Sequence, residues 1–116
     1  QVMKEYADQK PYIAEVTPAV GSTVMVDALP SEVVVRFSEP MSMNGYGMNW
    51  IQRHGIEHIP IEGSLRWQDE YTLVIPLDTA ALEPGKTYGA NLLGWAFRSQ
   101  KGFPVSGYYE VYFTVR

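Results

Sequence analysis

His54 and His58 are four residues apart, and paired imidazoles at that spacing are a candidate metal site. On a helix the two side chains would share one face, but Gly55 and Pro60 argue against a helix here. In an extended strand, positions four apart are separated by about 13 Å, too far to hold one ion. With no third ligand apparent, the sequence predicts two solvent-exposed loop histidines and no metal-binding residues.

Met41, Met43 and Met48 form a second group with ligand chemistry. Thioethers are soft ligands that suit Cu(I), and residues 37–40, Phe-Ser-Glu-Pro, are similar to a strand end in periplasmic copper-resistance sandwiches. Those proteins depend on histidines near the N-terminus, whereas this chain begins Gln-Val-Met. Because methionine also fills irregular gaps in a core, packing is the expected role and Cu(I) binding is the alternative.

Aromatic side chains offer a third kind of chemistry, because their flat faces can stack on sugar rings or anchor a partner protein. The candidates are Trp50, Trp67, Trp95, Tyr108 and Tyr109. Trp50 lies on the expected third strand and Trp67 shares a strand face with Leu65, so both are expected in the core. Trp95, Phe97 and Tyr108 fall in or beside loops and are predicted to be exposed, which marks a contact surface.

No arrangement for catalysis is visible in the sequence. Cysteine is absent, which excludes disulfides and thiolate chemistry. Neither histidine has the setting of a Ser-His-Asp site, and no glycine loop of the phosphate-binding kind occurs. The carboxylates near predicted turns are scattered rather than paired: Glu39, Asp69, Glu70, Asp78 and Glu83. We therefore expect no enzyme, no catalytic residues and no cofactor.

Composition narrows the class of protein further. The 116 residues fit one domain, and 46% are hydrophobic, enough for a core. The formal charge is −4 and the basic residues are dispersed, so nucleic acid is not an expected partner. No apolar run is long enough for a membrane span. Residues 1–10 are polar and are interpreted as an N-terminal extension or linker before a domain at 11–116.

The elements that must position these side chains are strands. Turn-forming residues recur about every ten residues, between short segments of alternating apolar and polar residues. The clearest segments are 32–37, 71–75 and 109–116, and weaker ones are 12–16, 46–52, 64–68 and 88–93. A hairpin tip at 69–70 and one helical turn at 79–82 complete the pattern. Seven or so strands with short turns predict an all-β sandwich, since each apolar face must pack against another.

Residues 82–88, Leu-Glu-Pro-Gly-Lys-Thr-Tyr, have the features of a tyrosine corner. In Greek-key sandwiches, a Tyr at the start of the sixth strand hydrogen-bonds the backbone of the preceding corner. Pro84 fixes φ and Gly85 permits positive φ, so the two form a tight turn that leads to Tyr88. Leu82 would close the bottom of the core. The alternative is an ordinary turn with a half-buried Tyr, and either way the motif concerns the fold.

Several motifs together resemble the bacterial immunoglobulin-like domain family of surface-layer proteins. They are Thr-Pro through Gly at 17–21, Val-Val-Val-Arg-Phe-Ser-Glu-Pro-Met at 33–41, Tyr-Thr-Leu-Val-Ile-Pro at 71–76, the turn at 82–88, and Phe-Thr at 113–114. They occur in the family's order and span about residues 11–115. The stretches 43–63 and 94–104 depart from the family's pattern, so any function specific to this protein is expected there. The resemblance implies an immunoglobulin-like Greek-key fold.

The resemblance also implies a non-catalytic accessory module of a larger secreted or surface-attached bacterial protein, located outside the cytoplasm. Such a module spaces domains, docks on a neighbouring domain or contacts another surface protein. We expect the contact surface to comprise Trp95, Phe97, Arg98, Phe103 and Tyr108. The alternative is a small-ligand module that binds carbohydrate through exposed aromatics or Cu(I) through methionines.

Overall fold

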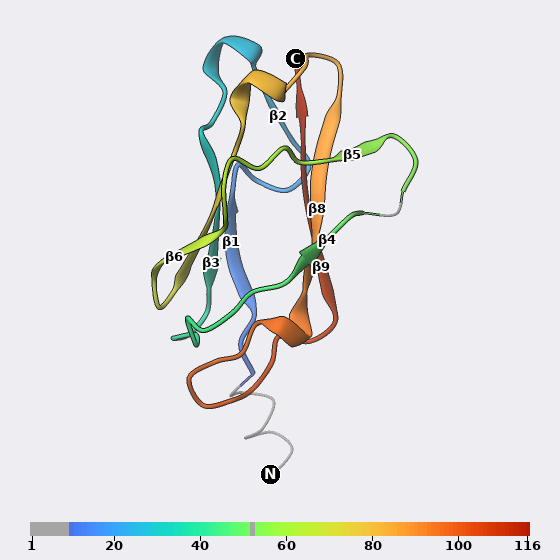
Figure 1. Cartoon of the computed structure of the whole chain (residues 1–116). Coiled ribbons are helices and arrows are strands. Elements are labelled where there is room, and N and C mark those ends of the chain that lie inside the picture. Colours follow the sequence, from blue (N-terminus) through green and yellow to red (C-terminus); the bar gives the residue numbers. More distant parts are fainter. Residues whose placement is uncertain (1–9, 52) are drawn as a thin grey trace.

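The computed structural model describes residues 10–51 and 53–116, which form two β-sheets and no α-helix (Figure 1). The first sheet contains, in spatial order, β1 (Ile13–Thr17), β3 (Glu32–Phe37), β7 (Thr72–Pro76) and β6 (Arg66–Asp69). The second contains β2 (Ser22–Val24), β9 (Tyr108–Val115), β8 (Thr87–Leu93) and β4 (Met48–Asn49), and β5 (Ile56–His58) also pairs with β8. Single 3-10 turns, η1 (Val26–Ala28), η2 (Thr79–Ala81) and η3 (Gly94–Ala96), lie in connections between strands.

The all-β prediction is confirmed. The predicted extension at 1–10 lies outside the described residues, except for Lys10.

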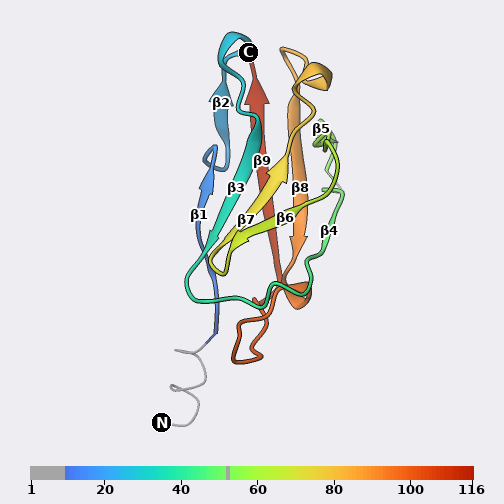
Figure 2. The ribbon, with the colours of Figure 1, turned by 60° about the vertical axis from the view of Figure 1, so that its left-hand side comes forward.

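The two sheets pack face to face, and the core lies between them (Figure 2). The alternation predicted for β3 and β9 is confirmed, because every second side chain is buried in that core: Val33, Val35, Phe37, Val111, Phe113 and Val115. Burial of these apolar faces is the main favourable term in the stability of the sandwich.

Strand β7 departs from the alternation that the sequence predicted, because Thr72 and Val74 on its outer face are also buried. This strand is flanked by β3 and β6. The ion pair between Arg66 Nη2 and Glu32 Oε2, 3.1 Å long, joins the two flanking strands beside Val74. Long side chains on the flanking strands therefore cover the outer face of the strand between them.

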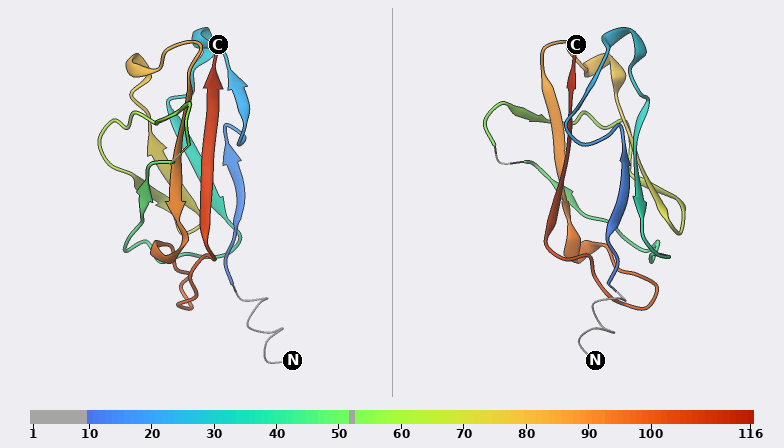
Figure 3. Two further views of the ribbon diagram at one scale, coloured as in Figure 1. Left: turned by 90° about the vertical axis from the view of Figure 1, so that its right-hand side faces the viewer. Right: turned by 180° about the vertical axis from the view of Figure 1, so that it is seen from behind.

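The strand predicted at 46–52 is much shorter in the structure, where only β4 is extended and paired. After Asn49 the chain leaves the sheet, and Ile51 lies over Gly89 on the outer face of β8. The segment directly before β5 stands out from the second sheet (Figure 1 and Figure 3). The chain then returns as β5, which pairs with β8 in parallel.

The hairpin between β6 and β7 turns one residue later than predicted. Strand β6 ends at Asp69 and β7 begins at Thr72, so Glu70 and Tyr71 form the turn. Asp69 Oδ1 accepts a hydrogen bond of 2.8 Å from the Tyr71 backbone N–H. The carboxylate closes a turn that lacks the usual glycine.

The molecule is elongated, with principal extents of 49 × 27 × 19 Å. The C-terminus lies at one end of the long axis, and the segment that leads into β1 lies at the opposite end (Figure 1). Within the described residues, no helix combines the length and apolar character that crossing a membrane requires.

Candidate functional site

The predicted contact residues divide between the surface and the core. Trp95 and Tyr108 are 62% and 67% exposed. Arg98 is exposed and donates from Nη1 to the carbonyl oxygen of Gly102 at 3.2 Å, and Phe103 is half-buried. Phe97, by contrast, is only 1% exposed, so its assignment to the surface was wrong.

Phe97 closes the end of the core that lies beside η3. Its backbone N–H donates to the Gly94 carbonyl at 3.0 Å and its carbonyl accepts from Val105 N–H at 2.9 Å, which fixes the direction of the side chain. The ring lies 5.5 Å from the ring of Phe37 and 6.3 Å from that of Trp67, between ring centres. Three aromatic rings from β3, β6 and the η3 loop therefore pack together.

Trp95 and Tyr108 are brought together by pairing at the ends of β8 and β9. Leu93 lies opposite Tyr108 in the ladder, and the Gly94 N–H donates to the Gly107 carbonyl at 2.9 Å. Each aromatic residue directly follows one of these two glycines in the chain. Because the bond joins the residues just before them, the two exposed rings come from neighbouring segments.

Tyr46, which is 43% exposed, joins this group from the segment before β4. The Leu93 N–H donates to the Gly47 carbonyl at 3.0 Å, which places Gly47 against η3. A Cβ atom at Gly47 would lie 2.6 Å from Cβ of Ala96, so only glycine permits this approach. We call Tyr46, Trp95 and Tyr108 the aromatic surface. An aromatic residue between two glycines, Gly-Tyr-Gly at 45–47, was the signal for Tyr46 in the sequence.

A row of polar groups continues from the aromatic surface along the outer face of the second sheet. Asn49, Asn91 and Glu110 are cross-strand neighbours on β4, β8 and β9. Asn91 Nδ2 donates to Asn49 Oδ1 at 3.3 Å, and Arg53 Nη2 lies 2.8 Å from Glu110 Oε1. Figure 3 shows β8 and β9 in front of the first sheet, with this outer face toward the viewer in its left panel. The aromatic surface therefore has a polar border of amides and paired charges.

Trp50 was expected in the core, and this assignment was wrong. It is 65% exposed, and its ring stacks on the imidazole of His58 with 5.0 Å between ring centres and 11° between planes. The chain leaves the sheet after Asn49, so the position after β4 lies at the edge. Trp67 is half-buried and packs against the core, and its Nε1–H donates to the Gly45 carbonyl at 3.1 Å.

The two histidines have different surroundings. His54 is exposed as predicted, whereas His58 is half-buried beneath Trp50, and its Nδ1 atom is buried without a hydrogen-bond partner. Among the described residues, no three His, Cys, Asp or Glu side chains gather as a metal site would require. The geometry assigns His58 a packing role against Trp50.

Burial of His58 has a consequence for stability that can be measured. Desolvation lowers the pKa of His58 below its ordinary value of 6.5. The unfolded chain therefore binds this proton more readily than the folded chain, so stability is lost as pH falls below 6.5. We expect the melting temperature of the native protein to fall more steeply below that pH than the melting temperature of a His58→Gln variant. Parallel melting curves for the two proteins across that range would contradict this expectation.

The methionines do not share an exposed site. Met41 is fully buried in the core, Met48 is half-buried and packs against it, and Met43 is 53% exposed. Met41 is held by its backbone, whose N–H donates to the Glu70 carbonyl at 2.7 Å. Packing therefore accounts for Met41 and Met48.

The carboxylates near turns have separate partners. Glu70 Oε2 accepts a hydrogen bond of 2.9 Å from Gln100 Nε2, and Glu83 Oε2 lies 2.8 Å from Lys86 Nζ. Asp69 closes the turn between β6 and β7. Each of these carboxylates thus has its own hydrogen-bond or ion-pair partner, and none of the three is paired with another carboxylate.

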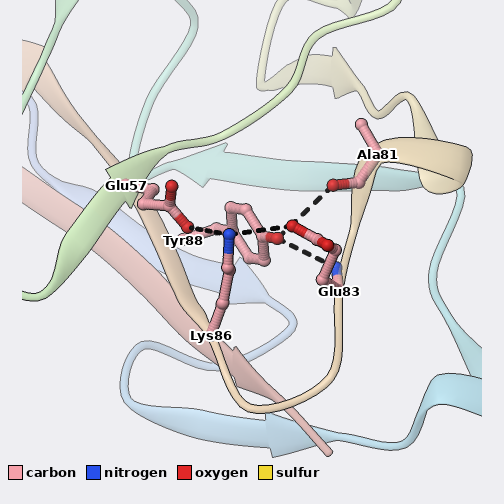
Figure 4. Close-up of polar contacts among 5 residues, drawn as sticks. All are labelled: Glu57, Ala81, Glu83, Lys86 and Tyr88. Atoms are coloured by element: carbon pink, nitrogen blue, oxygen red, sulfur yellow. Dashed lines mark hydrogen bonds and ion pairs between the residues drawn. The ribbon is translucent and has the colours of Figure 1, made fainter.

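The turn before β8 has the hydrogen bonds expected of a tyrosine corner (Figure 4). The Tyr88 hydroxyl accepts from the Glu83 backbone N–H at 2.9 Å and donates to the Ala81 carbonyl at 3.4 Å. Gly85 has φ of 87°, which favours glycine, and Leu82 is buried in the core. Pro84 directly precedes Gly85 in the exposed turn. These contacts tie the start of β8 to the connection from η2.

A chain of exposed charges lies beside this corner. Lys86 Nζ lies 2.8 Å from Glu83 Oε2 and 3.3 Å from Glu57 Oε2 on β5 (Figure 4). The hydrogen bond to Lys86 lowers the pKa of Glu83, and the hydrogen bonds to the two carboxylates raise the pKa of Lys86. Exposed pairs of this kind contribute little to stability.

No family model matches the chain, and comparison with curated proteins gives no match either. What the fold and the site define is therefore a small all-β protein of two packed sheets with an exposed aromatic surface at one end of the second sheet.

Proposed function

We propose that this chain is a non-catalytic, immunoglobulin-like accessory module of a larger extracytoplasmic bacterial protein, and that the aromatic surface docks it on a neighbouring domain. The exposure of Tyr46, Trp95 and Tyr108 carries the proposal. Buried aromatics dominate the energy of protein interfaces, and Trp and Tyr are enriched at their centres. Large aromatic side chains exposed on neighbouring segments, with amides and charged groups beside them, thus indicate a contact surface.

The strand order supports an immunoglobulin-like Greek key. In that fold, strands A, B, E and D form one sheet and C, F and G the other. If β1, β3, β7 and β6 are taken as A, B, E and D, the first sheet has the order A-B-E-D. With β9, β8 and β4 as G, F and C, the second sheet has the order G-F-C. Strand β2 then corresponds to a continuation of A that crosses to the second sheet and pairs with G in parallel.

The arrangement of the chain supports a place in a series of domains. The chain enters near one end of an elongated body and leaves at the other (Figure 1). A module built this way spaces its neighbours by its own length. The aromatic surface lies at the end of β8 and the start of β9, whereas Arg116 follows the other end of β9, so the length of that strand separates the two. Its position favours contact with a domain on the entry side.

Radical footprinting of the full-length protein that contains these residues tests the docking. We expect Trp95 and Tyr108 to be oxidised slowly in the full-length protein and rapidly in the isolated chain. Trp50 supplies the control, because it is as exposed as Trp95 and lies outside the aromatic surface, against His58. Docking would be refuted by equal oxidation of Trp95 in both proteins, with Trp50 also unchanged.

A further inference from the structure

A second recognition feature lies on the opposite side of the molecule, on the outer face of the first sheet. A groove of about 300 Å³ crosses all four of its strands. Its lining comprises Glu15 and Thr17 of β1, Val34 and Arg36 of β3, Thr72 of β7, and Gln68 and Asp69 of β6. The first sheet is in front of the second in Figure 2. The groove is at the lower limit of size for ligand pockets, so it suits a ligand of one or two small rings.

The strand register explains why the sheet is hollow here. Glu15 lies opposite Arg36, Arg36 opposite Thr72, and Thr72 opposite Asp69, so four side chains form one row across the sheet. Opposed residues in antiparallel strands point to the same face. Strand β7 contributes the short Thr72, which is 5% exposed, while β3 and β6 on either side of it contribute the longer Arg36 and Asp69. Short Thr72 between longer side chains therefore leaves a groove in the outer face of the sheet.

Arg36 is the group in this row that is free to bind a ligand. Arg53, Arg66 and Lys86 each lie within 3.3 Å of a carboxylate. Among the described residues, Arg36 forms no such pair, although Glu15 is its cross-strand neighbour. Its guanidinium carbon lies 5.7 Å from the centre of the Tyr71 ring. This cation–π contact holds the guanidinium beside the ring and occupies none of its N–H donors, so they are available to a ligand.

The carboxylates of the groove also have hydrogen-bonding capacity to spare. Asp69 is fixed by the bond from the Tyr71 N–H to Oδ1, which leaves Oδ2 as an acceptor. Glu15 Oε1 accepts a long bond of 3.5 Å from Thr17 Oγ1. Carboxylate acceptors on β1 and β6 with a guanidinium donor between them match a ligand with several hydroxyl groups. One guanidinium and two carboxylates leave a net charge of −1, which disfavours acidic ligands.

We propose that this groove binds a neutral or amino-bearing saccharide unit, with Arg36 donating to ring hydroxyls and Asp69 and Glu15 accepting from hydroxyl or ammonium groups. The inference does not depend on the aromatic surface, since the two features lie on different sheets. We expect a dissociation constant of about 1 mM for such a saccharide, because the groove is shallow and open to solvent.

NMR titration of the chain with a glucosamine dimer, cellobiose and digalacturonate tests the proposal. We expect the first two sugars to shift the amide signals of Arg36, Gln68, Asp69 and Thr72, and the acidic sugar to bind more weakly. An Arg36→Ala variant is expected to bind about tenfold more weakly, since a hydrogen bond to a charged group is lost. Arg66→Ala is the matched control, because Arg66 lies on the same face, is paired with Glu32 and does not line the groove.

Three outcomes would overturn the proposal. The first is the absence of shifts with all three sugars up to their solubility limits. The second is an equal loss of binding in the Arg36 and Arg66 variants, with both folded by their amide spectra. The third is a set of shifts at Tyr46, Trp95 and Tyr108 in place of the groove, which would assign the saccharide to the aromatic surface and leave the docking proposal to be judged by footprinting.

Discussion

A Phe97→Ala variant is expected to lose about 3–5 kcal/mol of unfolding free energy. The ring is 1% exposed and packs against Phe37 and Trp67, so its removal leaves a cavity at the end of the core. The surrounding loop is held by backbone hydrogen bonds at Phe97 and Ser99, which limits collapse into the space. Urea denaturation, monitored by far-UV circular dichroism, measures the difference in unfolding free energy between the native and Phe97→Ala proteins.

Trp95→Ala is the matched control for this experiment. The two aromatic residues are two positions apart, but Trp95 is 62% exposed, so its truncation should change stability by less than about 0.5 kcal/mol. Phe97→Leu should retain most of the stability, because leucine fills much of the space. If Phe97→Ala proved as mild as Trp95→Ala, the burial of the Phe97 ring between Phe37 and Trp67 would be incorrect.

This pair also shows where inference from sequence failed. The sequence Trp95-Ala96-Phe97 was predicted to be an exposed loop, and nothing in its composition distinguishes the inward ring from the outward one. The 3-10 turn η3 sets the direction of both rings, because it rotates the chain so that Phe97 points to the core. The prediction that Trp50 is buried was wrong for a related reason, because β4 ends at Asn49 and Trp50 lies beyond the strand. Side-chain direction in loops is set by tertiary contacts, which leave no periodic pattern.

Strands with one buried face were predictable, and very short strands were not. Strand β3 was predicted with its observed bounds, because period-two alternation over six residues is typical of a half-buried strand and of no helix. Strands β2 and β5 have three residues each and pair with distant segments in parallel, so they show too few residues for an alternation. Their existence depends on β9 and β8, which supply the hydrogen-bonding edge.

The candidate sites were predictable only in part. Trp95 and Tyr108 were identified because they fall in or beside predicted loops, and both are exposed. The row of Glu15, Arg36, Thr72 and Asp69 was not identified, because it comes from four strands in an order that the sequence does not follow. Such a row requires the register of three strand pairs at once.

A Tyr88→Phe variant is expected to lose about 1–3 kcal/mol of unfolding free energy, although only one oxygen atom is removed. The hydroxyl accepts from the Glu83 N–H at 2.9 Å, and without it that partly buried donor has no acceptor. Tyr88 itself is 4% exposed, so water has little access to the vacated position. The phenyl ring still fills the same space near Phe113, 6.4 Å away between ring centres, so the loss reports the hydrogen bonds and not the packing.

Lys86→Ala separates the tyrosine corner from the charges beside it. Lys86 is exposed and holds Glu83 and Glu57 only through solvent-accessible ion pairs, so its removal should lower the unfolding free energy much less than Tyr88→Phe does. Raising the salt concentration should narrow the difference in stability between the native and Lys86→Ala proteins and leave the Tyr88→Phe difference unchanged. Screening acts on exposed charges and not on a partly buried hydrogen bond between neutral groups. A Tyr88→Phe loss that salt abolished, or that Lys86→Ala matched, would assign the stability of this turn to the ion pairs. We expect the hydroxyl to account for it, because it is the group that joins η2, the Pro84-Gly85 turn and β8 inside the fold.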